Sequence, residues 1–262
     1  MLILLSPAKN LNFDPTPDAP AMTKPVFLKE ARELAGVAGK LSPARLKKLM
    51  SISDKLAELN HERFSAFRGD GKSNVQKQAA LAFNGEVYLG LDARTMTAAD
   101  FKFAQDHVRI LSGLYGLLRP LDAIEPYRLE MGSSLANARG ANLYAFWGEK
   151  IARQIDKALK GAKNPVVVNL ASNEYFAAVD RNALDAEIVT PSFKDEKDGK
   201  LRALQFFAKR ARGSMARWAI ENRIDDPQEL KKCGADGYRF RARESTQADW
   251  LFTRKQPPPK GA

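Results

Sequence analysis

Two short apolar runs constrain the fold of this 262-residue chain more than any other feature. They are MLILL at residues 1–5 and VVVNL at residues 166–170. Neither run alternates with polar residues, and a continuous apolar run favours a strand that is buried on both faces. Residues 1–5 are predicted to be a first strand rather than a signal peptide, because they lack a basic segment and a Ser-Pro pair follows directly.

The rest of the chain indicates one mixed domain. A hydrophobic content of 44% in 262 residues is enough for a large core. Helical and strand patterns interleave without a linker or an internal repeat, so we predict a single α+β domain over residues 1–255. Residues 256–262 contain three consecutive prolines and are predicted to be a disordered tail.

Capping and turn residues set the expected element boundaries. Prolines between residues 7 and 25 predict an ordered surface loop. Predicted helices cover residues 25–38, 42–50, 54–66, 74–82, 98–106, 143–160 and 208–222. Predicted strands cover residues 108–111, 187–194, 200–207, 237–242 and 249–254, with a hairpin turn at Asp198-Gly199.

The charge balance favours a polyanionic partner. Lys and Arg total 42 against 31 Asp and Glu, which gives a formal net charge of +11, and nucleic acid is the usual partner of such a protein. No apolar run approaches the roughly 20 residues of a membrane-spanning helix. A single cysteine, Cys233, allows no intramolecular disulfide and suits the cytoplasm.

The same composition gives no reason to expect a metal or another cofactor. Two histidines and one cysteine are too few for a soft-ligand metal site, although a carboxylate site for a hard cation stays open. Direct iron binding is therefore the weakest of the functional hypotheses.

Residues 46–60 have the pattern of a helix-hairpin-helix, a motif that binds DNA phosphates. Leu46 and Leu49 form an apolar pair, residues 51–53 form a small-apolar-small turn, and Ala57 is the small packing residue of the second helix. The first amides of that helix are unpaired and can bind a phosphate, to which Lys55 adds a charge.

The turn departs from the usual motif, because serine stands at both glycine positions. Serine tolerates a positive φ poorly, which could distort the hairpin. The alternative is an ordinary pair of helices in which Ser53 is the N-cap and Ile52 is buried.

Several further blocks at matching spacing show that the chain resembles the YaaA peroxide-stress family from residue 1 to about residue 254. The blocks are SPAK (residues 6–9), ISDKLA (52–57), LSGLYG (111–116), LRPLD (118–122), PYRLEMG (126–132), FWG (146–148), NLAS (169–172) and A-R-G (211–213). The resemblance implies an α+β domain with a basic cleft and a helix-hairpin-helix able to bind duplex DNA. It also implies a role in hydrogen-peroxide resistance, through limiting free iron and the oxidative DNA damage that iron causes.

Polar residues in these blocks could line such a cleft. Lys9 follows the first strand, and Arg119 and Arg128 lie in a proline-containing loop that suits phosphate binding. The alternative for these arginines is a salt-bridge cluster with Asp122, Glu125 and Glu130. Asn169, Ser172 and Glu174 stand at a strand-to-helix junction, which could bind an anion or be merely a capped helix start.

Helix 208–222 carries a basic stripe. Lys209 and Arg212 share a face with Gly213, whose missing side chain would let a backbone or a phosphate approach. The alternative is a solvated charged face. Aromatic residues near these blocks are expected to be core rather than base-stacking platforms; they are Tyr115, Tyr127, Trp147 and Tyr175.

The leading hypothesis is largely non-sequence-specific binding of double-stranded DNA. The residues expected to contact DNA are Ser51, Ile52, Ser53, Lys55, Arg119, Arg128, Lys209 and Arg212. The alternative is an enzyme that acts on DNA, as a lysine-dependent glycosylase or lyase, or on a nucleotide-like small molecule. Its catalytic candidates are Lys9, Glu130, Glu174 and Lys209. The sequence does not identify any protein partner.

Overall fold

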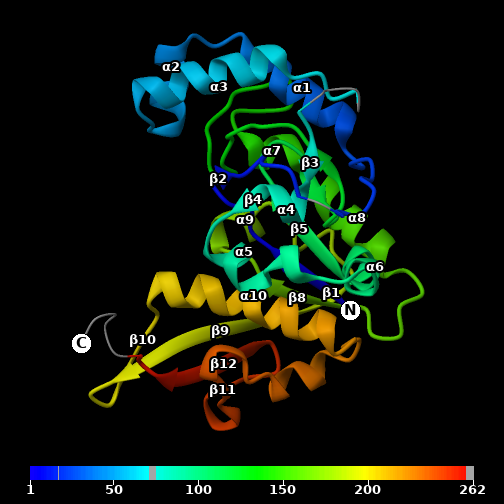
Figure 1. Cartoon of the computed structure of the whole chain (residues 1–262), viewed down its shortest axis with the longest axis vertical. Coiled ribbons are helices and arrows are strands. Elements are labelled where there is room, and N and C mark those ends of the chain that lie inside the picture. The colour runs from blue at the N-terminus through cyan, green and yellow to red at the C-terminus, as the bar shows by residue number, and fades with distance from the viewer. Residues whose placement is uncertain (17, 71–74, 258–262) are drawn as a thin grey trace.

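The two apolar runs are neighbouring strands at the centre of the protein (Figure 1). The computed structural model describes residues 1–16, 18–70 and 75–257. Strand β1 (Leu2–Leu5) pairs in parallel with β8 (Val166–Leu170), and Leu5 stands opposite Leu170. β1 is buried along its whole length, which confirms a strand covered on both faces.

The main sheet is mostly parallel. Its strands follow the order β11-β12-β9-β8-β1-β5-β6, with β10 paired to β9. The further strands are β5 (Val108–Ser112), β6 (Gly116–Leu118), β9 (Glu187–Lys197), β10 (Lys200–Arg202), β11 (Arg239–Phe240) and β12 (Asp249–Lys255). The neighbours β5, β1, β8, β9 and β12 are all parallel, while β6, β10 and β11 are antiparallel.

This arrangement corrects the predicted fold class. Numbered along the chain, the parallel strands stand in the order 2-1-3-4-5, which is that of flavodoxin-like doubly wound sheets. The protein is therefore a mixed α/β domain with a mostly parallel sheet, not an α+β domain. The buried apolar side chains form one continuous cluster. The predicted domain limits stay a prediction, and residues 258–262 of the predicted tail lie outside the described residues.

Helices and two small sheets surround the main sheet. The helices are α1 (Leu28–Gly39), α2 (Pro43–Met50), α3 (Asp54–Ala66), α4 (Ala79–Ala82), α5 (Glu86–Leu91), α6 (Ala98–His107), α7 (Leu143–Trp147), α8 (Lys150–Leu159), α9 (Asn173–Phe176) and α10 (Gln205–Glu221). Short 3-10 turns occupy Ala93–Thr95, Pro227–Lys232, Ala235–Gly237 and Ala242–Glu244. In the small sheets, β2 (Asn10–Leu11) pairs with β4 (Phe83–Asn84), and β3 (Lys77–Gln78) pairs with β7 (Ala123–Ile124).

Most predicted helices are present, and two of the predictions need correction. Ser42 and Thr97 cap the helices that they were expected to start, and Ser53 caps α3 as the alternative interpretation had it. The predicted helix 143–160 is instead two helices, because Gly148 has a φ of 46° and ends α7. Of the predicted helix 74–82 only α4 is helical, and residue 74 lies outside the described residues.

The predicted hairpin is confirmed at its turn, where Asp198 and Gly199 both have a positive φ. Its second arm is shorter than predicted, because α10 begins at Gln205.

Helix α5 was not predicted, and it packs closely against α10. A Cβ atom built on Gly213 would lie 1.8 Å from the carbonyl oxygen of Val87, and one on Gly90 would lie 2.2 Å from that of Arg210. Gly213 therefore lets the backbone of α5 approach, and the phosphate alternative is wrong at this position.

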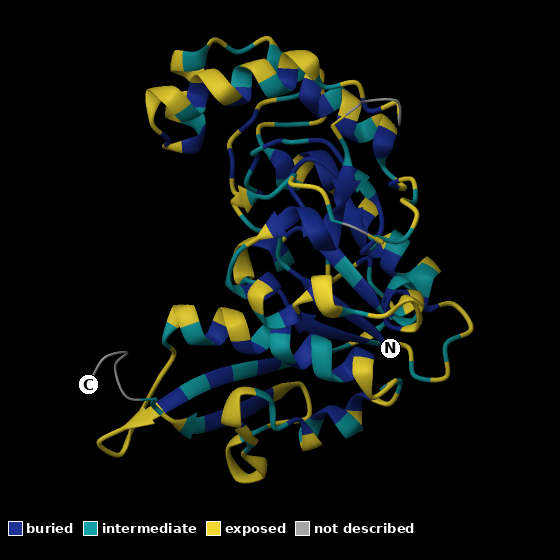
Figure 2. Cartoon of the chain, in the orientation of Figure 1, coloured by how far each residue is buried: buried dark blue, intermediate teal, exposed yellow. Residues whose placement is uncertain are grey.

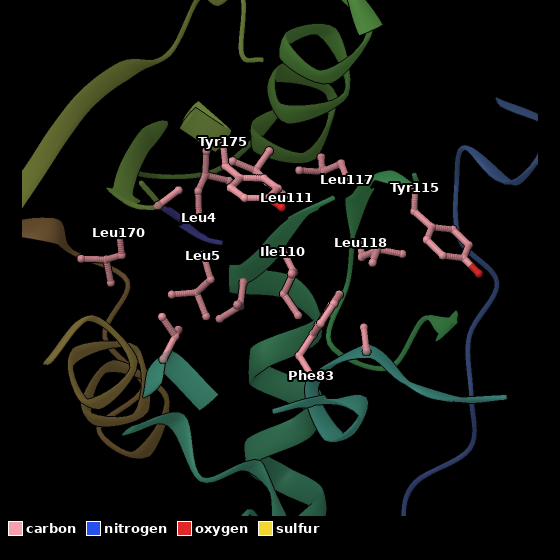
Figure 3. Packing of buried hydrophobic residues seen from close by; sticks show 14 of the residues in the cluster. Leu4, Leu5, Phe83, Ile110, Leu111, Tyr115, Leu117, Leu118, Leu170 and Tyr175 are labelled. Atoms are coloured by element: carbon pink, nitrogen blue, oxygen red, sulfur yellow. The ribbon is translucent and has the colours of Figure 1, made fainter. Parts of the chain in front are cut away.

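The helical pair α2–α3 forms one end of the longest axis, and the β9–β10 hairpin lies near the other (Figure 1). Burial is concentrated in the strands between them, and the outer faces of α2 and α3 are exposed (Figure 2). In the core, Leu5 and Ile110 pack from adjacent strands, with Phe83 beside them (Figure 3). Tyr115, Tyr127, Trp147 and Tyr175 are all buried, which confirms that they are core residues.

Candidate functional site at the carboxyl ends of the parallel strands

The strand order marks one position on the sheet where ligands usually bind. From β1 the chain continues to β5 on one side, whereas from β8 it continues to β9 on the other. In an open α/β sheet the crevice at such a reversal, outside the carboxyl ends of the strands, is the usual binding site. Here it lies beyond Leu5 and Leu170.

Two serines join the strands at this point. The backbone N–H of Ser172 donates to Ser6 Oγ at 2.8 Å, and the two hydroxyl oxygens are 3.3 Å apart. The hydroxyl of Tyr88 donates to the Ser6 carbonyl at 3.0 Å, so α5 also contacts this loop. Asn169 is buried, and its side-chain oxygen accepts a hydrogen bond from the backbone N–H of Ala171.

A lysine, a glutamate and an arginine form the charged part of the site. Lys9 Nζ lies 3.1 Å from Glu130 Oε2, and Arg128 Nη2 donates to Glu130 Oε1 at 3.0 Å. The Lys9 side chain is 64% exposed, whereas those of Glu130 and Arg128 are 22% and 17% exposed. Glu130 is thus held between two cations, of which only Lys9 is open to solvent. The small crevice behind them is lined by Pro7, Ala8, Tyr127, Leu129 and Tyr175.

The other carboxylate of this region has a structural role. Glu174 Oε1 accepts from the N–H of Gly132 at 3.0 Å, and the Tyr144 hydroxyl donates to the Glu174 carbonyl. Next to it, burial raises the pKa of Tyr175, and the neighbouring Tyr127, Glu174 and Glu130 raise it further. Tyr175 is therefore a neutral wall of the crevice at physiological pH.

Arg119 does not join this cluster. Its guanidinium donates to Asp122 Oδ1 and to the Lys24 carbonyl. Each arginine of the predicted pair thus has its own carboxylate, as the salt-bridge alternative proposed. Glu125 is no member of such a cluster, since its carboxylate accepts the backbone N–H groups of Arg68 and Gly69.

The two basic residues of α10 differ in their surroundings. Lys209 is exposed. Arg212 is mostly withdrawn from solvent, which lowers its pKa, and its Nε has no hydrogen-bond partner among the residues that the structure describes. Arg212 therefore does not belong to a solvated stripe.

The α2–α3 pair has the turn that the sequence indicated. Ser51 adopts the left-handed conformation with φ 51° and ψ 52°, and Ile52 is buried. Ser53 caps α3 by accepting the N–H of Leu56. The serine at the first glycine position thus adopts the glycine conformation, and the serine at the second is the N-cap of the alternative interpretation.

The described residues contain neither a group of metal ligands nor a membrane-spanning helix. Within residues 1–16, 18–70 and 75–257, no three or more His, Cys, Asp or Glu side chains are grouped as metal ligands. Over the same ranges, no helix combines the length and apolarity needed to cross a membrane.

Sequence reasoning named Lys9, Arg128, Glu130 and Ser172 but missed Ser6, which contacts Ser172, and Tyr88, which contacts Ser6. Ser6 could have been found, because it directly follows a buried strand. Tyr88 carried no usable signal, since it lies in the short helix α5, which was not predicted.

Fold and site together define an open, mostly parallel α/β protein with a charged cluster at its strand reversal. Residues 1–244 match the family described as peroxide stress protein YaaA, so the chain belongs to this family. The resemblance inferred from the sequence is thereby confirmed.

Its relatives are similar over their whole length. A UPF0246 protein of Maricaulis maris is 56% identical over 261 residues, which cover 100% of this chain and 98% of the relative. UPF0246 proteins of Caulobacter vibrioides and Ralstonia pickettii are 53% and 51% identical, covering 98% and 97% of this chain and 100% and 99% of the relatives.

Proposed function

We propose that this peroxide-stress protein binds duplex DNA without sequence preference and limits iron-driven oxidative damage to it. The observation that carries the proposal is the α2–α3 turn, where left-handed Ser51 and N-capping Ser53 place the start of α3 at the surface. This is the end of a 13-residue helix, and helix N-termini bind phosphate through unpaired amides and the helix dipole.

The first turn of α3 offers free donors. Ser53 Oγ accepts a hydrogen bond from the N–H of Leu56. The preceding amides of Asp54 and Lys55 have no partner inside the helix. The Asp54 carboxylate would repel a phosphate, but Lys47 Nζ pairs with it at 2.8 Å. Lys55 is exposed beside the same amides and supplies a positive charge.

Exposed cations extend this surface. Arg45, Lys47 and Lys48 lie on the exposed side of α2. Such residues neutralise phosphates and hold a duplex without reading its bases, which explains why no sequence preference is expected. Lys9, Arg119 and Lys209 are the candidates for further contacts elsewhere on the molecule, since each side chain is exposed in substantial part.

The test compares two exposed lysines in different parts of the molecule. Lys55→Ala removes the charge at the start of α3, and we expect duplex affinity to fall roughly tenfold, on the order of 1.4 kcal/mol. The control is Lys160→Ala, because Lys160 is also exposed but caps the carboxyl end of α8, away from α2 and α3 (Figure 1). Fluorescence anisotropy with a short labelled duplex measures both. Equal affinities of the Lys55 variant and the wild type would contradict the proposal.

The same variants test whether the protein protects DNA from iron-driven oxidation. Plasmid DNA exposed to ferrous iron and hydrogen peroxide is nicked, and we expect the wild-type protein to reduce the nicking at concentrations where it binds. Lys55→Ala should need about tenfold more protein for the same protection. Protection that does not follow DNA affinity would separate the peroxide role from DNA binding.

A further inference from the structure

Lys9 and Glu130 have the arrangement of a nucleophilic amine with its own base. Lys9 Nζ is 3.1 Å from Glu130 Oε2, within reach of a proton transfer. Arg128 binds the other oxygen through both Nε and Nη2, at 3.3 and 3.0 Å, and so fixes the carboxylate. Arg128 is a positioning residue, because its guanidinium faces Glu130 rather than the amine.

The surroundings determine which substrates can reach the amine. Tyr127 and Tyr175 are buried and fill the space behind the pair. The Lys9 side chain, in contrast, is 64% exposed. A substrate must therefore present its reactive group at the protein surface, which suits a group on a macromolecule better than an enclosed small molecule. The position at the reversal of the strand order is also where open α/β sheets bind their ligands.

We propose that Lys9 and Glu130 form a site that captures aldehydes in DNA, in particular the ring-opened sugar of an abasic site. This inference rests on the proposed function, because duplex binding brings the aldehyde to the amine. The chemical class follows from the residues: an exposed amine with an adjacent carboxylate is suited to imine formation with a carbonyl carbon.

The reaction needs no oxidant or other co-reactant. Glu130 takes a proton from the Lys9 ammonium, and the amine attacks C1′ of the aldehyde to form a carbinolamine. Glu130 returns the proton to the carbinolamine hydroxyl, which leaves as water, and a protonated imine remains. Glu130 then removes a proton from C2′. The electron pair moves to form the C2′–C3′ double bond as the C3′–O bond breaks and the phosphate leaves. Glu130 passes this proton to the departing phosphate, and water hydrolyses the protonated imine, which releases the unsaturated aldehyde and restores the Lys9 ammonium.

The experiment traps the imine. A duplex with one abasic site is incubated with the full-length protein and borohydride, which reduces the imine to a stable amine, and the covalent complex is quantified on a denaturing gel. Lys9→Arg keeps the positive charge and the partner of Glu130, but a guanidinium stays protonated and cannot form the imine. We expect the adduct to fall to background in Lys9→Arg, and peptide mass spectrometry to place the wild-type adduct on Lys9.

Matched controls separate this site from other lysines. Lys160→Arg and Lys163→Arg, at exposed lysines outside both proposed sites, should form the adduct at the wild-type rate, whereas Glu130→Gln should form it about 100-fold more slowly. The pH dependence of the remaining rate should also change in Glu130→Gln, which a merely structural role would not cause. An adduct that persists in Lys9→Arg, or one found on another lysine, overturns the inference.

A second measurement distinguishes the two proposals. A duplex with a tetrahydrofuran abasic analogue has no aldehyde, so its affinity reports binding alone. Binding of this duplex without a Lys9 adduct on the aldehyde duplex overturns the aldehyde site and leaves the proposed function intact. If no duplex binds, the proposed function fails.

Discussion

At the scale of single residues, the carboxylates of this protein take their roles from the donors around them. Glu130 accepts from Arg128 and pairs with exposed Lys9, so one of its oxygens faces a group that can exchange a proton. Glu174 lies close by but accepts a backbone amide, which gives it a structural role. Both are glutamates near a strand end, and the sequence offered no way to separate them.

The donors around Asp100 likewise determine how its carboxylate contributes to the stability of the fold. Hydrogen bonds from Thr97 and the ion pair with Arg223 together lower the pKa of Asp100 to about 2. A carboxyl in an unfolded chain has a pKa of about 3.9. The carboxylate therefore stabilises the fold fully above about pH 4, and this stabilisation is lost as the pH falls from about 4 to about 2.

Asp100→Asn should lower the free energy of unfolding by about 1 kcal/mol at neutral pH, because it weakens the capping box at the start of α6. Urea unfolding measures the difference, which should shrink as the pH falls below about 4. Asp106→Asn is the control, since Asp106 is exposed on the same helix. A difference for Asp100→Asn that does not change with pH would show that its charge has no part in the effect.

At the scale of elements, local chemistry sets where helices start, and packing sets how they cross. The helices α2 and α3 begin at capping serines, which the sequence shows directly. The crossing of α5 and α10 depends on two glycines that lie more than a hundred residues apart in the chain, Gly90 and Gly213.

Gly213→Ala should destabilise the protein by about 1–3 kcal/mol or more, because the new methyl group would overlap the α5 backbone. Gly36→Ala provides the opposite case. Gly36 lies in α1 with nothing near its Cβ position, so Gly36→Ala should raise the free energy of unfolding by about 0.5–1 kcal/mol. Thermal unfolding compares the two variants. Equal shifts in Tm would exclude the close crossing as the cause.

At the scale of the whole molecule, the net charge of +11 attracts polyanions and makes their binding depend on salt concentration. If the exposed cations of the α2–α3 pair contact about four phosphates, log Kd should change with log salt concentration with a slope of about 3.6 in magnitude. Anisotropy titrations over a range of salt concentrations measure this slope. A slope near zero would argue against phosphate contacts as the main source of affinity.

The sequence by itself determined the two buried central strands, the capped helices and the turn at Ser51, since each depends on neighbouring residues. It also indicated most of the polar residues at the strand ends. It could not give the parallel register of β1 with β8, because pairing between residues more than a hundred positions apart leaves no local pattern. Only the tertiary structure placed Ser6 against Ser172 and Lys9 against Glu130, and it separated Arg119 from both. The physical reason is that these contacts join strands and loops that meet only when the sheet assembles.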